Sequence, residues 1–295
     1  MDHVRAIVLD VTPERPLARA CVVHARATDT VNTNHVDLTA AVDDRGTLAR
    51  LAGAEIAAEA FLSDLNGATV GRGFRARLAP LAQLGPHERL LRRVLWELPI
   101  VVQVASQTAL LDHPGAGHFV MLDERGIDQC SGWRARGEMF TQAVGDDGLL
   151  RMPLGPERPG PTLTAPWLPD LREIPPMSTR RSRVLSVQDD VVRLHHQDAY
   201  ADPDGVSRAL HEWSVTARLD GRAENRRIGA ISVEAGRLPW QECPFAGASA
   251  ERLVGRALGE IEQAVAEEFL GIGTCTHLND LLRMLADVSD VASIR

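Results

Sequence analysis

The chain has 295 residues, a mass of 32.1 kDa and a formal net charge of −8 at neutral pH. With 44% hydrophobic and 24% charged residues, it has the composition of a globular protein. The acidic balance argues against an extended nucleic-acid footprint, and no apolar run is long enough to cross a membrane. The first residues lack the basic and apolar segments of a signal peptide, and four cysteines do not make a disulfide framework, so we expect a cytoplasmic protein.

All 32 basic residues are arginine, and this excludes several chemistries. Without lysine no Schiff base can form, so pyridoxal-phosphate enzymes and class I aldolases are ruled out. The phosphate-binding loop of P-loop proteins and the usual kinase site also need a lysine. The sequence by itself does not identify a substrate.

The first third of the chain predicts strands followed by helices. Alternating apolar and polar residues bounded by turn residues indicate strands, and helical patterns follow them. In chain order the predicted elements are strands at 20–27, 35–42 and 47–54, and helices at 55–65, 71–81 and 87–98. This order is typical of an α+β unit.

The last third repeats that order after a middle segment, 99–180, which is rich in Pro and Gly and is predicted to be irregular. The basic stretch 177–183 is interpreted as the solvated start of a strand, with anion binding as the alternative. The elements that follow are predicted as strands at 191–196, 213–219 and 227–234, and helices at 245–253, 258–269 and 274–285.

Matching spacings suggest that the two ends of the chain are similar. Gly67 and Gly85 are separated by 18 positions, and so are Gly255 and Gly273. We therefore predict an α+β fold of two similar halves, each a small antiparallel sheet followed by helices, joined by the irregular middle segment. The predicted domains are a degenerate N-terminal copy, the middle segment, and a C-terminal half carrying the candidate site, at 1–98, 99–180 and 181–295. The alternative is that any two α+β segments of similar length show such matching spacings.

The residues able to do chemistry gather in the C-terminal half. Cys275 and His277 stand at the predicted start of the final helix, where the helix dipole and free N–H groups favour a thiolate. Cys243 opens the preceding helical region, His211 lies just before the middle strand, and Asp198 lies on the neighbouring strand. If the helices pack on the sheet, these five side chains converge.

Three interpretations of this group remain open. In the first, a zinc ion is held by members of the group, above all Cys243, Cys275 and His277. In the second, no metal is needed: His211 or His277 carries a proton, and Asp198 orients the ring. In the third, the cysteines pack as small hydrophobic residues and a histidine caps a turn. Any one residue by itself favours the structural interpretation, whereas the set taken together favours a functional site.

Three further residues are predicted to bind substrate. Trp213 and Trp240 can line a pocket for an apolar ligand, with a place in the core as the alternative. His35 is the N-terminal counterpart of the histidine before the middle strand, and the degenerate half is expected to close the pocket from above. The adjacent His195 and His196 are set aside, because alternation on a strand sends their rings to opposite faces.

The residues around this candidate site resemble a known family. The resemblance rests on the strings at 238–244, 248–255 and 274–282. They are similar to domain of unknown function 2889, whose shorter members resemble only the last third of this chain. Those members carry an Asp, a His, a Cys-Pro and a Cys-Thr-His-Leu, at the places of Asp198, His211, Cys243 and Cys275–Leu278 here. Longer actinobacterial members resemble nearly the whole chain, including 128–133 and 180–183. The resemblance implies no particular activity.

A remoter resemblance is to iron–sulfur scaffold proteins, and it concerns the order of residue types. Those proteins also present an Asp from a hairpin, a Cys opening a helix, and a His and a Cys near a final helix. Here Cys275 precedes His277 by two positions, whereas the His and Cys are adjacent in that family. Since fold does not fix function, this likeness only adds weight to the metal interpretation.

We therefore expect a cytoplasmic enzyme of small-molecule metabolism that uses non-redox acid/base chemistry on a partly apolar organic substrate, with or without the help of zinc. Its class would be lyase, hydratase, isomerase or hydrolase, with His211, Asp198 and His277 as catalytic residues. The alternatives are a non-enzymatic metal- or cluster-handling protein and an assembly partner of a neighbouring enzyme. Zinc is the only candidate cofactor, and neither nucleic acid nor a membrane is an expected partner.

Overall fold

The computed structural model describes residues 3–14, 20–30, 34–53, 59–108, 127–143, 174–222 and 225–291. In these residues the chain forms one antiparallel sheet of eight strands, in the order β4-β3-β2-β1-β5-β6-β7-β8. The strands are β1 (His3–Pro13), β2 (Cys21–Asp29), β3 (His35–Val42), β4 (Leu48–Ala52), β5 (Thr179–Gln188), β6 (Val191–Ala201), β7 (Ser207–Asp220) and β8 (Arg227–Ala235). The predicted α+β class is confirmed.

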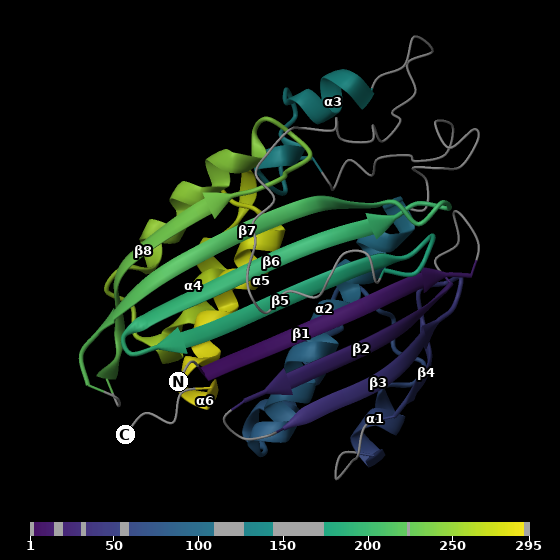
Figure 1. Ribbon diagram of the computed structural model, residues 1–295, viewed down its shortest axis with the longest axis horizontal. Helices are drawn as coiled ribbons and strands as arrows, with labels where there is room; N and C mark the ends of the chain where they lie inside the picture. The colour runs from purple at the N-terminus through teal and green to yellow at the C-terminus, as the bar shows by residue number, and fades with distance from the viewer. Residues whose placement is uncertain are drawn as a thin grey trace.

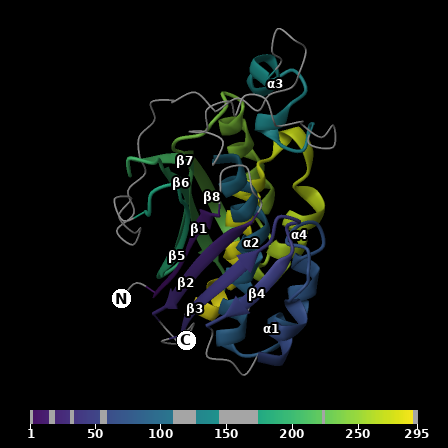
Figure 2. The ribbon, with the colours of Figure 1, turned by 90° about the vertical axis from the view of Figure 1, so that its right-hand side faces the viewer.

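The helices gather on one face of this sheet (Figure 1, Figure 2). They are α1 (Glu59–Leu65), η1 (Arg75–Gln83), α2 (Pro86–Thr108), η4 (Ser131–Trp133), α3 (Glu138–Ala143), η7 (Cys243–Leu253), η8 (Leu258–Glu260), α4 (Ile261–Glu268), η9 (Gly271–Gly273), α5 (Thr276–Leu282), η10 (Arg283–Asp287) and α6 (Val288–Val291), where η marks a 3-10 helix. Helix α2 contacts β1, β2, β3 and β5, and α5 contacts β6 and β7.

The core lies between the sheet and these helices. On β1 the alternate residues Ile7, Leu9 and Val11 point to the helices and are at most 1% exposed, and Leu91 and Leu95 of α2 are fully buried in the same cluster. Burying one such side chain contributes about 1.5–3 kcal/mol. Charged residues are unusual in such an apolar layer, yet a group of them lies within it.

Each half of the sheet is a four-stranded meander followed by helices, and the two meanders join where β1 pairs with β5. The halves also share a local contact. The Gly67 N–H donates to the Leu48 carbonyl oxygen at 2.8 Å, and the Gly255 N–H donates to the Ile228 carbonyl oxygen at 2.7 Å. Both glycines have a positive φ, of 83° and 84°, which glycine adopts without steric penalty. This correspondence supports two similar halves, and their origin by duplication stays a prediction.

Strand β1 was not predicted, and the surroundings of β5 were predicted wrongly. β1 is central and covered on both faces for much of its length, so it lacks the alternation that reveals a half-exposed strand. The solvated start expected near β5 is wrong, because Arg180, Arg181 and Arg183 are at most 2% exposed. Their guanidinium groups are buried with carboxylates; Arg180, for example, donates to Asp10 at 2.6 and 2.8 Å. Instead of two small sheets, the halves thus build one continuous sheet.

The middle segment is irregular only in part. Helix α2 continues through Pro99 to Thr108, and η4 and α3 lie further along the segment. The rest of the Pro- and Gly-rich stretch, 109–126 and 144–173, lies outside the described residues. Although α2 has 23 residues, no helix in the described parts of the chain is both long and apolar enough to span a membrane.

Candidate active site

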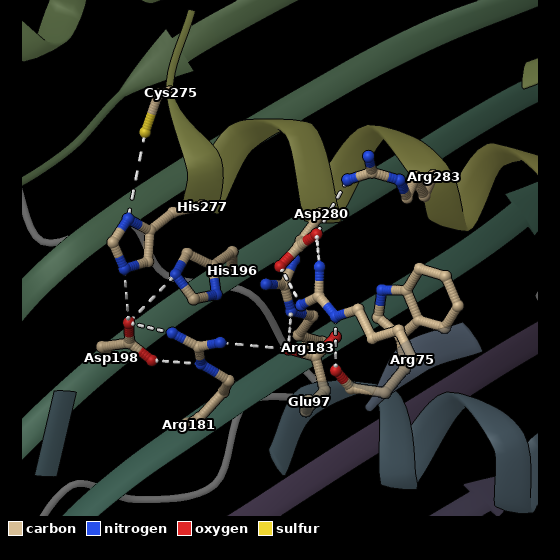
Figure 3. Close-up of polar contacts among 11 residues, drawn as sticks. Arg75, Glu97, Arg181, Arg183, His196, Asp198, Cys275, His277, Asp280 and Arg283 are labelled. Carbon is tan, nitrogen blue, oxygen red and sulfur yellow. Dashed lines mark hydrogen bonds and ion pairs between the residues drawn. The ribbon is translucent and has the colours of Figure 1, made fainter. Parts of the chain in front are cut away.

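A group of polar side chains interrupts the apolar, helix-facing side of β5, β6 and β7. Arg181 on β5 lies opposite Asp198 on β6, which in turn lies opposite His211 on β7. The next cross-strand row on the same face consists of Arg183, His196 and Trp213. From above, α5 brings His277 and Asp280 toward these strands, and α2 contributes Glu97 (Figure 3).

Arg181 holds the carboxylate of Asp198 in a fixed position. Its Nε donates to Oδ1 and its Nη2 donates to Oδ2, both at 2.7 Å, and neither side chain has any exposed surface. This is the bidentate geometry in which arginine binds a carboxylate most strongly. Burial alone would raise the pKa of Asp198, but the charge of Arg181 holds that pKa well below its usual range. Asp198 is therefore an anion in the folded protein.

Three imidazole nitrogens surround one oxygen of this carboxylate. Nε2 of His196, Nδ1 of His211 and Nε2 of His277 lie 3.4, 3.5 and 3.6 Å from Asp198 Oδ2. None of these nitrogens makes a hydrogen bond with any residue that the structure describes. The rings of His211 and His277 stack at a centroid distance of 4.1 Å with planes 15° apart. An unsatisfied buried polar atom is costly, so three around one oxygen point to a site for a further group.

Access to solvent differs among the three rings. His196 is fully buried, whereas the side chains of His211 and His277 are 18% and 15% exposed. Burial lowers the pKa of His196 to about 3 despite the nearby Asp198. Burial, followed by the neighbouring His211, also lowers the pKa of His277 well below its usual range. His196 and His277 are therefore uncharged at neutral pH.

The charges around this group extend to both helices. Arg181 Nη1 and Arg183 Nε each lie 3.1 Å from Glu97 Oε2. Asp280 accepts hydrogen bonds from Arg75 and Arg283. Four guanidinium groups thus face three carboxylates, from Arg75, Arg181, Arg183 and Arg283 and from Glu97, Asp198 and Asp280. These seven charged groups together carry one excess positive charge.

Comparison with known proteins gives a family match for this region. Residues 179–290 match the model of a family described as a protein of unknown function, DUF2889. The C-terminal part of the chain resembles this family. No curated protein and no solved structure matches the chain. The likeness to iron–sulfur scaffold proteins therefore stays a prediction.

The DUF2889-like region contains every residue of the predicted site except His35. Among the described residues, the one group of potential metal ligands that lie within 4.8 Å of one another is Asp198, His211 and His277. Cys275 Sγ lies 4.0 Å from His277 Nδ1, at the edge of this group. Cys243 is near the Cys130 and Cys275 thiols but does not join the group. The structure thus brings together the predicted Asp198, His211 and His277. Among the described residues, it does not assemble Cys243, Cys275 and His277 as a group of metal ligands.

The thiolate expected at the start of the last helix does not fit the surroundings. Cys275 caps α5 and is 6% exposed. Backbone N–H groups of Leu278 and His277 favour the thiolate, but burial outweighs them and raises the pKa of Cys275. Burial also raises the pKa of Cys130 to about 12. These thiols are protonated and behave as small hydrophobic residues.

Of the predicted substrate-binding residues, only Trp213 lies beside the group around Asp198, on β7 next to His196. Trp213 and Trp240 are 0% and 5% exposed and belong to the hydrophobic core cluster. His35 lies on β3, four strands from β6, which corresponds to about 19 Å at the usual strand spacing. The structure therefore does not bring His35 to the group around Asp198.

Several polar residues of the site were not predicted. His196 had been set aside because its neighbour His195 faces the other way, and His195 indeed bonds to Ser214, with Nδ1 and Oγ 2.9 Å apart. The useful signal was the spacing of two: His196 and Asp198 share one face of β6, as Arg181 and Arg183 share one face of β5. Glu97 had no such signal, because only the packing of α2 brings it near β5.

Proposed function

We propose that this protein is an enzyme of small-molecule metabolism that uses non-redox acid/base chemistry, in the lyase, hydratase, isomerase or hydrolase class. The observation that carries the proposal is the series Arg181–Asp198–His211. Arg181 fixes the carboxylate at two points, and the carboxylate faces Nδ1 of His211 at 3.5 Å. Nδ1–H directed at Asp198 leaves the lone pair on Nε2, as in other carboxylate–histidine pairs.

His211 is the better candidate of the two exposed rings for proton transfer. His277 faces Asp198 with Nε2 and the Cys275 thiol with Nδ1, so both of its nitrogens are directed at the protein. Nδ1 of His211 and Nε2 of His277 are buried and make no hydrogen bond within the described chain. Nε2 of His211, by contrast, is not a buried atom without a partner. We assign His211 as the general acid or base, and Asp198 and His277 as positioning residues.

The apolar surroundings favour a partly apolar organic substrate. Next to His211 on the same strand face lies the buried Trp213, and Val215 follows it. A low-dielectric setting strengthens the interaction of Asp198 with an imidazolium formed during proton transfer. The same setting would be poor for a large, highly polar substrate.

The proposal can be tested without knowing the substrate. Purified protein is incubated with a protein-free metabolite extract, and mass spectrometry records compounds that gain or lose water, are hydrolysed, or isomerise. We expect at least one such change with the wild type and its loss with His211→Gln. The matched control is His24→Gln, on the exposed side of β2. A change that persists unaltered in His211→Gln would contradict the assignment.

A second candidate function is metal handling, with a metal-assisted enzyme as one form of it. A tetrahedral zinc ion with bonds of about 2.0–2.1 Å holds its ligand atoms about 3.4 Å apart. The nitrogen–oxygen distances around Asp198 Oδ2 are close to this value. Against it, Arg181 already uses both carboxylate oxygens, and the stacked rings of His211 and His277 do not direct their lone pairs at a common point.

Metal analysis separates the two candidates. The protein is purified without a histidine tag and its metal content is measured by mass spectrometry, before and after addition of cobalt(II), whose absorption bands report tetrahedral binding. The acid/base proposal expects no stoichiometric metal and no such bands. About one zinc ion per chain, lost in His211→Gln and His277→Gln, would favour the metal candidate.

A further inference from the structure

Arg183 is a buried cation that the protein leaves largely unsatisfied. Its side chain has no exposed surface, and Nε, Nη1 and Nη2 make no hydrogen bond with the described residues. Within the described part of the chain, its one close ion pair joins Nε to Glu97 Oε2 at 3.1 Å, and that same oxygen also accepts a hydrogen bond from Arg181. A guanidinium has five N–H donors, so most of the hydrogen-bonding capacity of Arg183 is unused.

The fold itself does not require an arginine at this position. In the N-terminal half, Ile7 takes the corresponding place on β1, two residues after the buried Arg5, as Arg183 stands two residues after Arg181. Ile7 packs in the core and is 1% exposed. Because an uncompensated buried charge costs several kcal/mol, an apolar residue would serve stability better here. Arg183 therefore calls for a functional explanation.

The nearest anion to Arg183, Glu97, is shared with Arg181, and its neighbour on β6 is an uncharged histidine. His196 lies directly opposite it on β6, and both ring nitrogens of His196 are buried without a hydrogen bond. His196 in turn stacks near His277 at a centroid distance of 5.7 Å, and His277 is partly exposed. Arg183, His196 and His277 thus all have buried polar nitrogen atoms without a hydrogen bond among the described residues. The surrounding cluster carries one excess positive charge, as counted above.

We propose that Arg183 binds a carboxylate group of the substrate. This inference rests on the proposed function and names the substrate class as organic acids. The paired Nη1 and Nη2 donors match the two oxygens of a carboxylate. A carboxylate brings a single negative charge, which equals the excess of the cluster, whereas a phosphate group brings about −1.5 to −2.

The probe for this site is acetate, which needs no knowledge of the whole substrate. Thermal unfolding is followed with increasing sodium acetate at constant ionic strength, with sodium chloride making up the balance. The wild type should be stabilised in a saturable manner. Arg183→Met keeps the length of the side chain without its charge, and Glu97 retains its contact with Arg181. In this variant we expect the apparent affinity for acetate to fall at least tenfold.

Three controls make the result decisive. Arg193→Met removes an exposed arginine on the other face of β6 and should leave the acetate response unchanged. Arg183→Lys keeps the charge and loses the paired donors, and should show an intermediate response even if Arg183→Met does not fold. His211→Gln should still respond to acetate, so that loss of turnover and loss of anion binding are distinguishable.

Three outcomes would overturn the proposal. These are a wild type that does not respond to acetate, an Arg183→Met variant that responds like the wild type, and inorganic phosphate binding more tightly than acetate. The last would assign the site to a different anion. Since acetate binding is measured without turnover, the proposal can fail while the acid/base assignment of His211 stands, and the reverse also holds.

Discussion

Two buried arginine–aspartate pairs occupy corresponding places in the two halves of the sheet. Arg5 on β1 lies opposite Asp29 on β2, and Arg181 on β5 lies opposite Asp198 on β6. All four side chains have no exposed surface, and the closest nitrogen–oxygen distances are 2.9 and 2.7 Å. The backbone thus presents the same ion pair twice, at one position in each meander.

The surroundings of the two pairs differ. The next cross-strand row is Ile7, Ala27 and Val36 in the N-terminal half, and Arg183, His196 and Trp213 in the C-terminal half. The helices differ as well: Arg5 meets the carboxylate of Asp287, whereas Asp198 meets the imidazole of His277. An apolar row is therefore compatible with this sheet, and we propose that the polar row of the second half serves chemistry and not folding.

The largest effects should come from removing one partner of either pair. Asp29→Leu and Asp198→Leu each leave a buried arginine without its main partner and should destabilise the protein by about 3–5 kcal/mol. The double variants Arg5→Met/Asp29→Leu and Arg181→Met/Asp198→Leu should recover most of that loss, since a matched apolar pair is well tolerated. Denaturant unfolding measures both. A double variant no more stable than its single aspartate variant would break the comparison.

A smaller effect is expected when the pH is lowered, because a buried histidine on a C-terminal strand makes the unfolding free energy depend on pH. His195 on β6 is buried, and burial lowers its pKa to about 4. The unfolded chain therefore takes up this proton near pH 6.5 and the folded chain only near pH 4. The unfolding free energy should fall across that window as the pH decreases, by up to about 3 kcal/mol from this residue.

The measurement is the unfolding free energy of wild type and His195→Gln at several values between pH 7 and pH 4. The variant should show a shallower decline than the wild type. The exposed His24 serves as the control, and His24→Gln should decline like the wild type. Equal slopes for all three proteins would show that His195 is not the source.

The sequence predicts a strand best when one of its faces is exposed and the other is buried. The strand 35–42 was predicted with the bounds that β3 has, because its residues alternate in burial. No residue of β1 is exposed, and the strand gave no alternation. The helix predicted at 87–98 is longer in the structure: α2 continues through Pro99 to Thr108, although proline lacks the N–H of an internal helical bond. At β5 the buried arginines contradict the usual hydrophobic pattern, and this is where the candidate site lies.

The smallest effects should come from the matched glycines. A Cβ added at Gly67 or Gly255 would meet nothing within 4 Å, so the penalty for alanine is the positive φ alone. Gly67→Ala and Gly255→Ala should each lower the unfolding free energy by about 1 kcal/mol. Thermal or denaturant unfolding compares the two. Clearly unequal values would weaken the correspondence between the halves.

The candidate site was predicted in part. Asp198, His211 and His277 were chosen by residue type and by order along strands and the last helix, and the structure places their ligand atoms within 4.8 Å. The metal set with Cys243 and Cys275 relied on residue type without knowledge of packing, which buries both thiols away from the ring nitrogens facing Asp198. Sequence spacing cannot show which face of a helix meets the sheet.

We propose that the second arginine–aspartate pair supports chemistry and that the first supports folding. The most direct test measures turnover in the metabolite assay at equal concentrations of folded protein, for the wild type, His211→Gln and Arg5→Met/Asp29→Leu. We predict a loss of at least about a hundredfold for His211→Gln, as expected for a lost general acid or base, and wild-type turnover for the double variant. Wild-type turnover in His211→Gln, or an equal loss in both variants, would contradict the account.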